Sequence, residues 1–323
     1  RKNVDSHRHV QKTEPQLLFV SSQIHQGQTA KSTGPKPIER NSVNGYGNFK
    51  GYFWTYIGDE GHPYSAYDFT TSHSRDGPAR FLEGYSGYLH ADAYTGYDAT
   101  FSGIGSNVFE VACWAHTRRR FFEAVGNCPR QAHQVGEWIR QLYTIEHRAH
   151  DMSVEARREL RAAEAVPVLD KIETYLDELA PRALPKSALA KAVTYARNQW
   201  TALRRYTEDG RLTIDNNISE RTLRHQAIGR KNWLFLGSEA AGPRAAVLYT
   251  ILAGAKRHRI EPWTYVRDIL LRLHADDQRI EDLLPDRWAA AHPEAILNHR
   301  LEESRTKAIR TRARHAHRRK RSK

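Results

Sequence analysis

The pattern of hydrophobic and polar positions divides the chain into a part that predicts strands and a part that predicts helices. Aromatic and β-branched residues in GYFWTYIGD, a turn at D-E-G-H-P and the alternating segment YSAYDFT predict a hairpin from residue 51 onward. A short helix at ARFLEGY and two further strands, YLHADAY and VFEVACWAH, follow. The helix TRRRFFEAV comes next, and strands that alternate with helices indicate a mixed α/β sheet.

Between residues 129 and 212 the chain changes to the period of amphipathic helices. Two apolar faces in this block are Val135, Trp138, Ile139, Leu142 and Ile145, then Leu189, Val193, Ala196, Trp200 and Leu203. Prolines at positions 167, 181 and 185 separate the helical segments. After this block, in TIDNNISERTLRHQAIGRKNWLFLGS, we expect a helix that begins near Asp215 to Asn217 and runs into a short aromatic strand. Two more amphipathic helices are expected in AAVLYTILAGAKRH and PWTYVRDILLRL.

The two ends of the chain have the weakest pattern. Residues 1–50 are polar, and their one apolar run, LLFVSSQI, is the place for a remnant first strand. Residues 301–323 contain a block of like charge, RTRARHAHRRKRSK, of a kind that is usually disordered. We therefore expect a degenerate first segment and a basic disordered tail.

Composition limits the class of protein. At 323 residues the chain is long enough for about two domains with packed cores. Its two cysteines, Cys113 and Cys128, are too few for a disulfide framework and fit a reducing compartment. No apolar run reaches the roughly 18 to 20 residues of a membrane span, so we expect no membrane partner. Because the chain starts at Arg1 and its one methionine is Met152, we expect a fragment that lacks its natural start.

The net charge is strongly positive, but most of the excess lies at one end. Lys plus Arg number 50 and Asp plus Glu 37, which gives +13. Ten of the cations lie between Arg305 and Lys323, where there is no acid, so the rest of the chain has 40 against 37. The tail is either a solubilising extension or an arm that contacts phosphates without sequence preference. In the second case, deleting it should weaken DNA binding equally on all sequences.

Two acidic residues lie where an α/β protein commonly places its site. Asp92 lies in the third predicted strand, near the carboxyl end of what should be a central strand. Glu220 lies in DNNISER, five positions after Asp215. Each also has a plain structural explanation. Asp92 can cap a turn, and the Asp-Asn-Asn run can cap a helix whose first turn favours Glu220.

Basic and aromatic residues near these two acids in the sequence favour a functional role for the pair. These are Arg118, Arg119 and Arg120 after CWAH, then Arg221, Arg224, Arg230, Lys231 and Trp233. Carboxylates among cations suit Mg²⁺ and a nucleic-acid backbone, because carboxylate oxygens bind the hard ion while Arg and Lys hold phosphates. Two ions about 3.5 to 4 Å apart can support in-line phosphoryl transfer. The set favours nuclease or strand-transfer chemistry; acids far apart in the fold would instead favour a structural DNA-binding module.

Other chemistries have little support in the sequence. Cys113 and His116 have a zinc-compatible spacing in C-W-A-H, but Cys128 and the scattered histidines supply no second pair. We expect Cys113 to pack as a small hydrophobic residue. The chain has no Walker loop, dinucleotide fingerprint or G-x-S-x-G motif.

Six ordered segments resemble the transposases of the insertion-sequence-66 family over roughly residues 50 to 290. They are GYFWTYIGD, SRDGPARFLEGYSGYLHADAYTGYD, EVACWAHTRRRFFEA, LPKSALAKAVTYARNQWTALRRY, IDNNISERTLRHQAIGRKNWLFLGSEAAG and PWTYVRDIL. The resemblance implies an α/β fold, a ribonuclease-H-like mixed sheet with a DDE active site, an all-helical insertion and a small helical C-terminal element. It makes Asp92 the second catalytic Asp and Glu220 the closing Glu, which together hold Mg²⁺ or Mn²⁺ in a two-ion site.

The resemblance also implies partners and a domain division. DNA, as transposon ends and target, is expected to contact Arg118, Arg119, Arg221, Arg224, Arg230, Lys231, Asn232 and Trp233. The segments are 1–50 (degenerate N-terminal segment), 51–128 (first part of the core), 129–212 (helical insertion), 213–258 (core completion with the closing Glu), 259–300 (C-terminal helical element) and 301–323 (basic tail). We expect a homo-oligomer that acts on DNA in the bacterial cytoplasm, associated with the nucleoid.

One motif departs from the family pattern. The family has its first catalytic Asp in an Asp-Glu-Thr motif on the first strand, upstream of the Gly-Tyr-Phe-Trp segment. Here the corresponding stretch is IHQGQT, with Gly27 and Gln28 in the places of the two acids. Asp59 is the nearest replacement, although it belongs to the following strand. Two hypotheses result: a transposase that cleaves transposon ends and joins 3′-hydroxyls to target DNA, or a decayed or truncated copy that binds DNA without catalysis.

Overall fold

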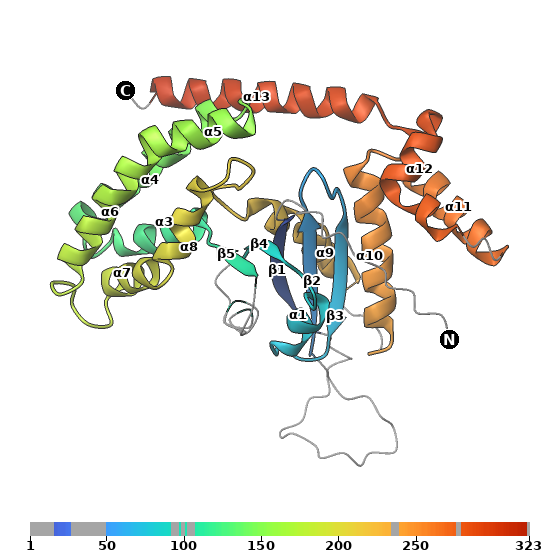
Figure 1. Cartoon of the computed structure of the whole chain (residues 1–323), viewed down its shortest axis with the longest axis horizontal. Helices are drawn as coiled ribbons and strands as arrows, with labels where there is room; N and C mark the ends of the chain where they lie inside the picture. Colours follow the sequence, from blue (N-terminus) through green and yellow to red (C-terminus); the bar gives the residue numbers. More distant parts are fainter. Residues whose placement is uncertain are drawn as a thin grey trace, which may run out of the picture.

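A mixed five-stranded sheet lies at the centre of the molecule, with helices around it (Figure 1). The computed structural model describes residues 16–26, 50–91, 97, 101, 107–233, 239–275 and 279–321. The strands are β1 (Gln16–Gln26), β2 (Lys50–Gly58), β3 (Ser65–Thr70), β4 (Gly87–His90) and β5 (Val108–Val111). Their order is β3-β2-β1-β4-β5; β1, β2 and β3 pair antiparallel, whereas β1, β4 and β5 pair parallel. The protein is therefore mixed α/β and mostly helical.

The hairpin of β2 and β3 forms where the sequence predicts it. Phe53 and Trp54 are neighbours in the chain and both are buried, one on each face of the sheet, because side chains alternate along a strand. Phe53 pairs with Phe69 across the ladder. The turn closes with a hydrogen bond from the Gly58 amide to the Tyr64 carbonyl at 3.0 Å. A Cβ at Gly58 would lie 2.1 Å from the His62 carbonyl oxygen, so the turn needs glycine there.

The parallel part of the sheet places the carboxyl ends of two strands at one edge. The run LLFVSSQI lies within β1, which confirms the expected first strand. In the ladder Phe19 pairs with His90, and His90 pairs with Val111. The Ala91 amide then donates to the Val111 carbonyl at 3.1 Å. The short helix α1 (Asp76–Phe81) precedes β4 and overlaps the expected helix at ARFLEGY.

Helices fill the region after β5, and Figure 1 shows them on one side of the sheet. They are α3 (Trp114–Ala124), α4 (Pro129–Ala149), α5 (Val154–Leu160), α6 (Val166–Leu179), α7 (Ala188–Asn198) and α8 (Trp200–Arg204), with a π-helical stretch Arg161–Ala165 and a 3₁₀ turn Arg205–Thr207. Val135, Ile139 and Leu142 are fully buried, which confirms the expected apolar face of α4. Trp114 of α3 belongs to the same core, so these helices continue the core of the sheet.

Two helices cover the sheet next to the hairpin. Helix α9 (Asn217–Trp233) packs on β1 and β2, and α10 (Ala241–Arg257) packs on β3. Leu223 of α9 joins Phe53 and Phe69 in one apolar cluster. The expected helix after the block is α9 and runs through Trp233, whereas residues 234–238, where the short aromatic strand was expected to follow, lie outside the described part.

The C-terminal part has a small core of its own. Helices α11 (Pro262–His274) and α12 (Pro285–Ala291), with 3₁₀ turns Ile280–Leu283 and Pro293–Ala295, bury Tyr265, Ile269 and Trp288 together with Ala255 of α10. None of the helices in the described part of the chain is both long and apolar enough to cross a membrane.

The end of the chain is helical, which corrects the expectation of a disordered tail. Helix α13 (His299–Arg321) crosses the top of the view in Figure 1, from α12 towards α5. Its sequence has no glycine or proline and is rich in Ala, Arg and Lys, which have high helix propensity. Acids lie in the first turns and cations follow, as the helix dipole favours. Like charge alone was therefore a poor indicator of disorder here.

Candidate active site

The segment before α9 is tied to the end of β4 by a buried histidine. His90 is fully buried, and its Nε2 lies 3.0 Å from the carbonyl oxygen of Thr213, so the ring N–H donates this bond. Burial lowers the pKa of His90 to about 4, although the Thr213 hydrogen bond acts in the opposite direction. His90 is therefore neutral at pH 7. Asp92 itself, two positions further along, lies outside the described residues.

Two more contacts fix the same segment against the start of α3. The Trp114 amide donates to the Ile214 carbonyl at 3.1 Å, and the Asn216 amide donates to Sγ of Cys113 at 3.3 Å. Cys113 is buried, as expected from the sequence, and burial raises the pKa of its thiol to about 11. Residues 213–216 therefore run beside the carboxyl ends of β4 and β5.

The expected cap of α9 is confirmed and sets the position of its first turn. The Asn217 amide donates to Oδ1 of Asp215 at 3.2 Å. The Ser219 hydroxyl donates to Oδ1 of Asn216 at 2.7 Å, and both of these residues are fully buried. The first contact satisfies a backbone amide that a helix start otherwise leaves unpaired, and the second fixes the Asn216 side chain at the helix start. They also fix the direction in which Glu220 leaves the helix.

Glu220 faces a histidine of α3. Its Oε1 lies 3.3 Å from Nε2 of His116, and the two side chains are 39% and 24% exposed. The contact is an ion pair only when the ring is protonated. Nδ1 of His116 is buried, and no hydrogen-bond partner for it lies among the described residues. Glu220 is thus an accessible carboxylate beside a nitrogen base, at the edge where β4 and β5 end.

Asp215, the other acid of the motif, is occupied by structural contacts. Its Oδ2 accepts a hydrogen bond from the Tyr143 hydroxyl at 3.0 Å, and its Oδ1 accepts the Asn217 amide. Arg118 lies over the Tyr143 ring, 5.6 Å from guanidinium carbon to ring centroid. Asp215 therefore orders α4 against α9, and Glu220 remains the available ligand of the motif.

The expected DNA contacts divide into two groups along α9. Arg118 and Arg119 on α3, and Arg221 and Arg224 on the first two turns of α9, are exposed and belong to the same end of these helices as Glu220. The other four are Arg230, Lys231, Asn232 and Trp233. They occupy the last turn of α9, roughly 15 to 20 Å from Glu220 along the helix axis at 1.5 Å per residue. The structure does not place these two groups together.

Asp59, the nearest alternative to the first acid of the family pattern, is part of a turn at another edge of the sheet. Its Oδ1 accepts the His62 amide at 2.8 Å and lies 3.0 Å from Nδ1 of His62, so it is part of the β2–β3 turn. Because Gly58 pairs with Leu18 and β2 is antiparallel to β1, this turn lies at the edge opposite the carboxyl end of β4. The sequence of β1, QLLFVSSQIHQ, contains no acid, and Gly27 and Gln28 lie outside the described residues.

The described residues fit a divalent ion only in part. They include no group of three His, Cys, Asp or Glu side chains arranged to hold a metal. Glu220 offers an accessible hard carboxylate of the kind Mg²⁺ and Mn²⁺ bind, whereas each carboxylate oxygen of Asp215 already accepts a structural hydrogen bond. A complete site would need Asp92 beside Glu220.

Comparison with known proteins identifies the family. The chain belongs to the family described as "Transposase IS66 family", whose model matches residues 42–244. "Uncharacterized protein y4jD" of Sinorhizobium fredii (strain NBRC 101917 / NGR234) is 32% identical over 237 residues, 71% of this chain and 46% of y4jD. "Uncharacterized protein y4hP" of the same strain is 28% identical over 270 residues, 76% of this chain and 49% of y4hP. The chain spans about half the length of the curated relatives it matches.

The sequence interpretation missed three residues that shape this site. His116 was considered only as half of a zinc pair, although its place just after a strand end could have suggested a site residue. His90 carries its own signal, since a polar residue in an otherwise apolar strand needs a partner. Tyr143 gave no signal in the sequence, because an aromatic residue on a helix usually joins a core.

Proposed function

We propose that this chain contains the catalytic region of a DDE transposase with a ribonuclease-H-like core. The observation that carries the proposal is the set of contacts that hold Glu220 at the carboxyl edge of β4 and β5: His90 with Thr213, Cys113 with Asn216, and His116 with Glu220. Asp92 follows His90 by two positions, and His90 is hydrogen-bonded to the segment that leads to Glu220. The mixed parallel and antiparallel sheet supports the same core.

Asp92 and Glu220 would be the residues that hold Mg²⁺ or Mn²⁺. When bound, a pair of such ions supplies charge stabilisation and an activated oxygen nucleophile for phosphoryl transfer. The chain itself supplies the orientation: the cap of α9 and His116 hold the Glu220 carboxylate, and buried His90 fixes the end of β4. Orientation of ligands by outer contacts of this kind typically changes metal affinity or activity by about 10- to 100-fold.

The DNA backbone would follow α3 and α9. Arg118, Arg119, Arg221 and Arg224 are exposed around the proposed ion site and suit phosphates next to the reacting bond. Residues 230–233, at the far end of α9, would contact DNA several nucleotides away. The proposal includes both transposon ends and target as DNA partners, a homo-oligomeric active form, and action on DNA in the bacterial cytoplasm at the nucleoid.

A strand-cleavage assay with Mg²⁺ or Mn²⁺ on DNA that carries the transposon ends tests the proposal. Asp92→Asn and Glu220→Gln should each lower cleavage by at least about a hundredfold, because each removes a proposed ion ligand without changing side-chain size. Glu123→Gln, an exposed acid of α3 outside the site, is the matched control and should cleave like the parent chain. Parent cleavage that both site variants retain would refute the assignment.

A second candidate function is a decayed copy that binds DNA but does not cleave it. One observation favours it. Phe19 of β1 pairs with His90, the last residue of β4. A first acid would be needed near this level, and β1 has none. Salt-sensitive DNA binding without cleavage by any of the variants would support this candidate, and turnover that Asp92→Asn abolishes would exclude it.

A further inference from the structure

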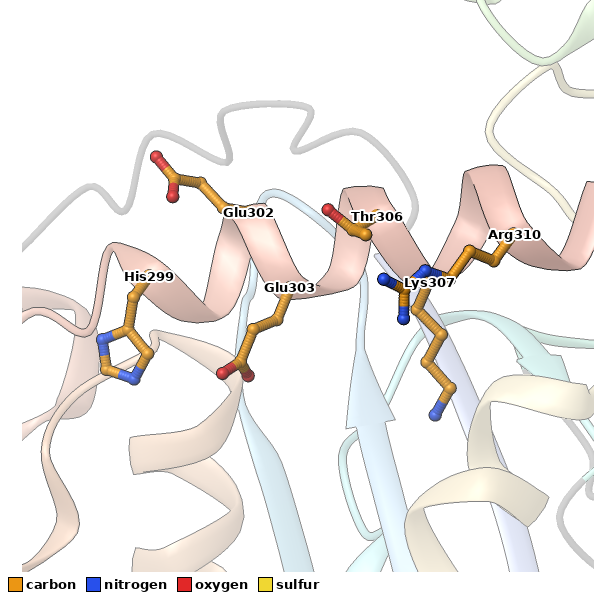
Figure 2. Close-up of a pocket in the computed structure, with 6 residues that line it drawn as sticks. All are labelled: His299, Glu302, Glu303, Thr306, Lys307 and Arg310. Carbon is orange, nitrogen blue, oxygen red and sulfur yellow. The ribbon is translucent and has the colours of Figure 1, made fainter.

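Helix α13 is a cationic surface that projects from the rest of the molecule. Every side chain that the structure describes on it is exposed, including Ile309. The hollow beside it is lined by side chains of α13: His299, Glu302, Glu303, Thr306, Lys307 and Arg310 (Figure 2). From position 305 to the end of the helix there are nine Lys or Arg residues and no acid. The helix is thus neither a core element nor a wall of an enclosed pocket.

The cations of α13 have helical spacing. Lys307, Arg310 and Arg314 are three and four residues apart, so they lie on one face of the helix, and the sequence continues this series at positions 318 and 321. Between 307 and 321 the series extends about 21 Å along the axis. Within the described part of the chain no carboxylate lies within 4 Å of these three side chains, since the one ion pair formed by α13 is Arg300 with Glu303.

This arrangement implies a polyanionic partner. Like charges three and four residues apart destabilise a helix by a few tenths of a kcal/mol per pair, and nothing in the described structure compensates them. Phosphates spaced along a duplex would remove this repulsion, because double-stranded DNA has one charge per roughly 1.7 Å of axis. A membrane surface fits less well, since an interfacial helix needs an apolar face and the sequence of α13 has only two large apolar residues, Leu301 and Ile309.

We propose that α13 is a second DNA-binding element, separate from the site around Glu220, and that the Lys307, Arg310 and Arg314 face contacts the backbone of duplex DNA without reading its sequence. The proposal rests on the proposed function only for the choice of DNA as the polyanion. In Figure 1 α13 lies over the β2–β3 turn, which is at the edge opposite the carboxyl end of β4. The helix would therefore hold a different stretch of DNA from the one at Glu220.

The test compares two triple variants of the full chain. One changes Lys307, Arg310 and Arg314 to Gln, which keeps helix propensity and removes three charges. The other changes Arg158, Lys171 and Lys191 to Gln; these are exposed cations of the helices between β5 and α9 for which the structure shows no ion pair, and they lower the net charge equally. The measurement is the Kd for two duplexes of unrelated sequence, taken over a series of salt concentrations by fluorescence anisotropy.

We expect the α13 variant to bind both duplexes at least about tenfold more weakly at 0.1 M salt. The slope of log Kd against log salt should fall by about 2 to 3, since each lost phosphate contact removes about 0.9. The control variant should change both quantities far less. Equal losses in the two variants would reduce the effect to net charge and overturn the proposal. Unchanged DNA binding of the α13 variant would also overturn it. So would an α13 variant that binds DNA like the parent chain but binds vesicles of anionic phospholipid more weakly.

The outcomes also separate this inference from the proposed function. A parent chain that binds duplex DNA, with an α13 variant that binds equally well, refutes the role of α13 and leaves the proposed function intact. A parent chain that does not bind duplex DNA at all refutes both. As a second readout, hydrogen exchange of the amides in residues 305–321 should slow when duplex is added to the parent chain, and an unchanged rate counts against the proposal.

Discussion

At the scale of single residues, the sequence predicted what depends on near neighbours and missed what depends on distant ones. The Asp-Asn-Asn run before Glu220 was expected to cap a helix, and it does, because capping partners lie within three residues of one another. The contact of Glu220 with His116 joins residues far apart in the chain, and nothing in their local sequence announces it. The same holds for His90 with Thr213.

The two thiols should differ in reactivity. Burial raises the pKa of Cys113 from 9.0 to about 11, so its reactive thiolate is nearly absent at pH 8, whereas Cys128 is only partly buried. Titration of the native chain with a chromogenic disulfide reagent at pH 8 should therefore detect one thiol, and two after unfolding in urea. Two fast thiols in the native chain would show that Cys113 is not enclosed.

The raised pKa of Cys113 also makes the free energy of unfolding depend on pH. The unfolded thiol loses its proton near pH 9 and the native thiol near pH 11, so the native state holds the extra proton between them. The protonated thiol therefore makes its full contribution to the free energy of unfolding below pH 9, and this contribution is lost as pH rises through 11. Urea unfolding of the parent chain and of Cys113→Ala should show a smaller loss of stability in the variant between pH 9 and 10.

At the scale of elements, periodicity predicted most of the strands and helices, and the errors lie where two signals compete. The apolar faces of α4 and α7 were legible because each has a buried stripe at helical spacing. The aromatic residues of NWLFL suggest a strand, but the first of them, Trp233, still belongs to α9. In α13 the block of like charge suggested disorder, yet the uninterrupted run of good helix formers forms a helix.

The segment that leads to α9 depends on one buried arginine. Arg161 is 1% exposed and makes two hydrogen bonds to Glu146, at 2.8 and 2.6 Å. It also donates to the carbonyls of Tyr206, Asp209 and Leu212, at 2.8, 3.0 and 2.9 Å. This side chain therefore anchors residues 206–212, which precede the segment tied to His90.

Replacing this arginine should be costly. Arg161→Met leaves the Glu146 carboxylate and three carbonyls without their donor, and loss of one partner of a buried pair typically costs about 3 to 5 kcal/mol. Arg148→Met is the matched control. Its two hydrogen bonds to Glu164 are also short, 2.6 Å each, but both side chains are exposed, so the cost should stay below about 1 kcal/mol. Urea unfolding followed by circular dichroism measures both, and similar values for the two variants would contradict this account.

At the scale of the whole molecule, the sequence could predict a mixed sheet and a block of helices but not how they meet. Residue patterns indicated strands, and alternation with helices indicated the sheet. Surrounding cations singled out Asp92 and Glu220, and the family resemblance supplied their roles, but a long helical segment separates them and no local rule predicts that residues 213–216 return to the ends of β4 and β5. The structure accounts for the return through three contacts of residues 213–216 with the ends of β4 and β5.

Binding of Mn²⁺ tests the central claim most directly, because it asks whether Asp92 and Glu220 serve one ion site. The Mn²⁺ affinity of the parent chain, Asp92→Asn, Glu220→Gln and the double variant can be measured by electron paramagnetic resonance. Residues that share a site are not additive, so we predict that each single variant weakens binding at least about tenfold and that the double variant loses little more. Single variants that bind like the parent chain, or losses that simply add, would show that the two acids do not meet.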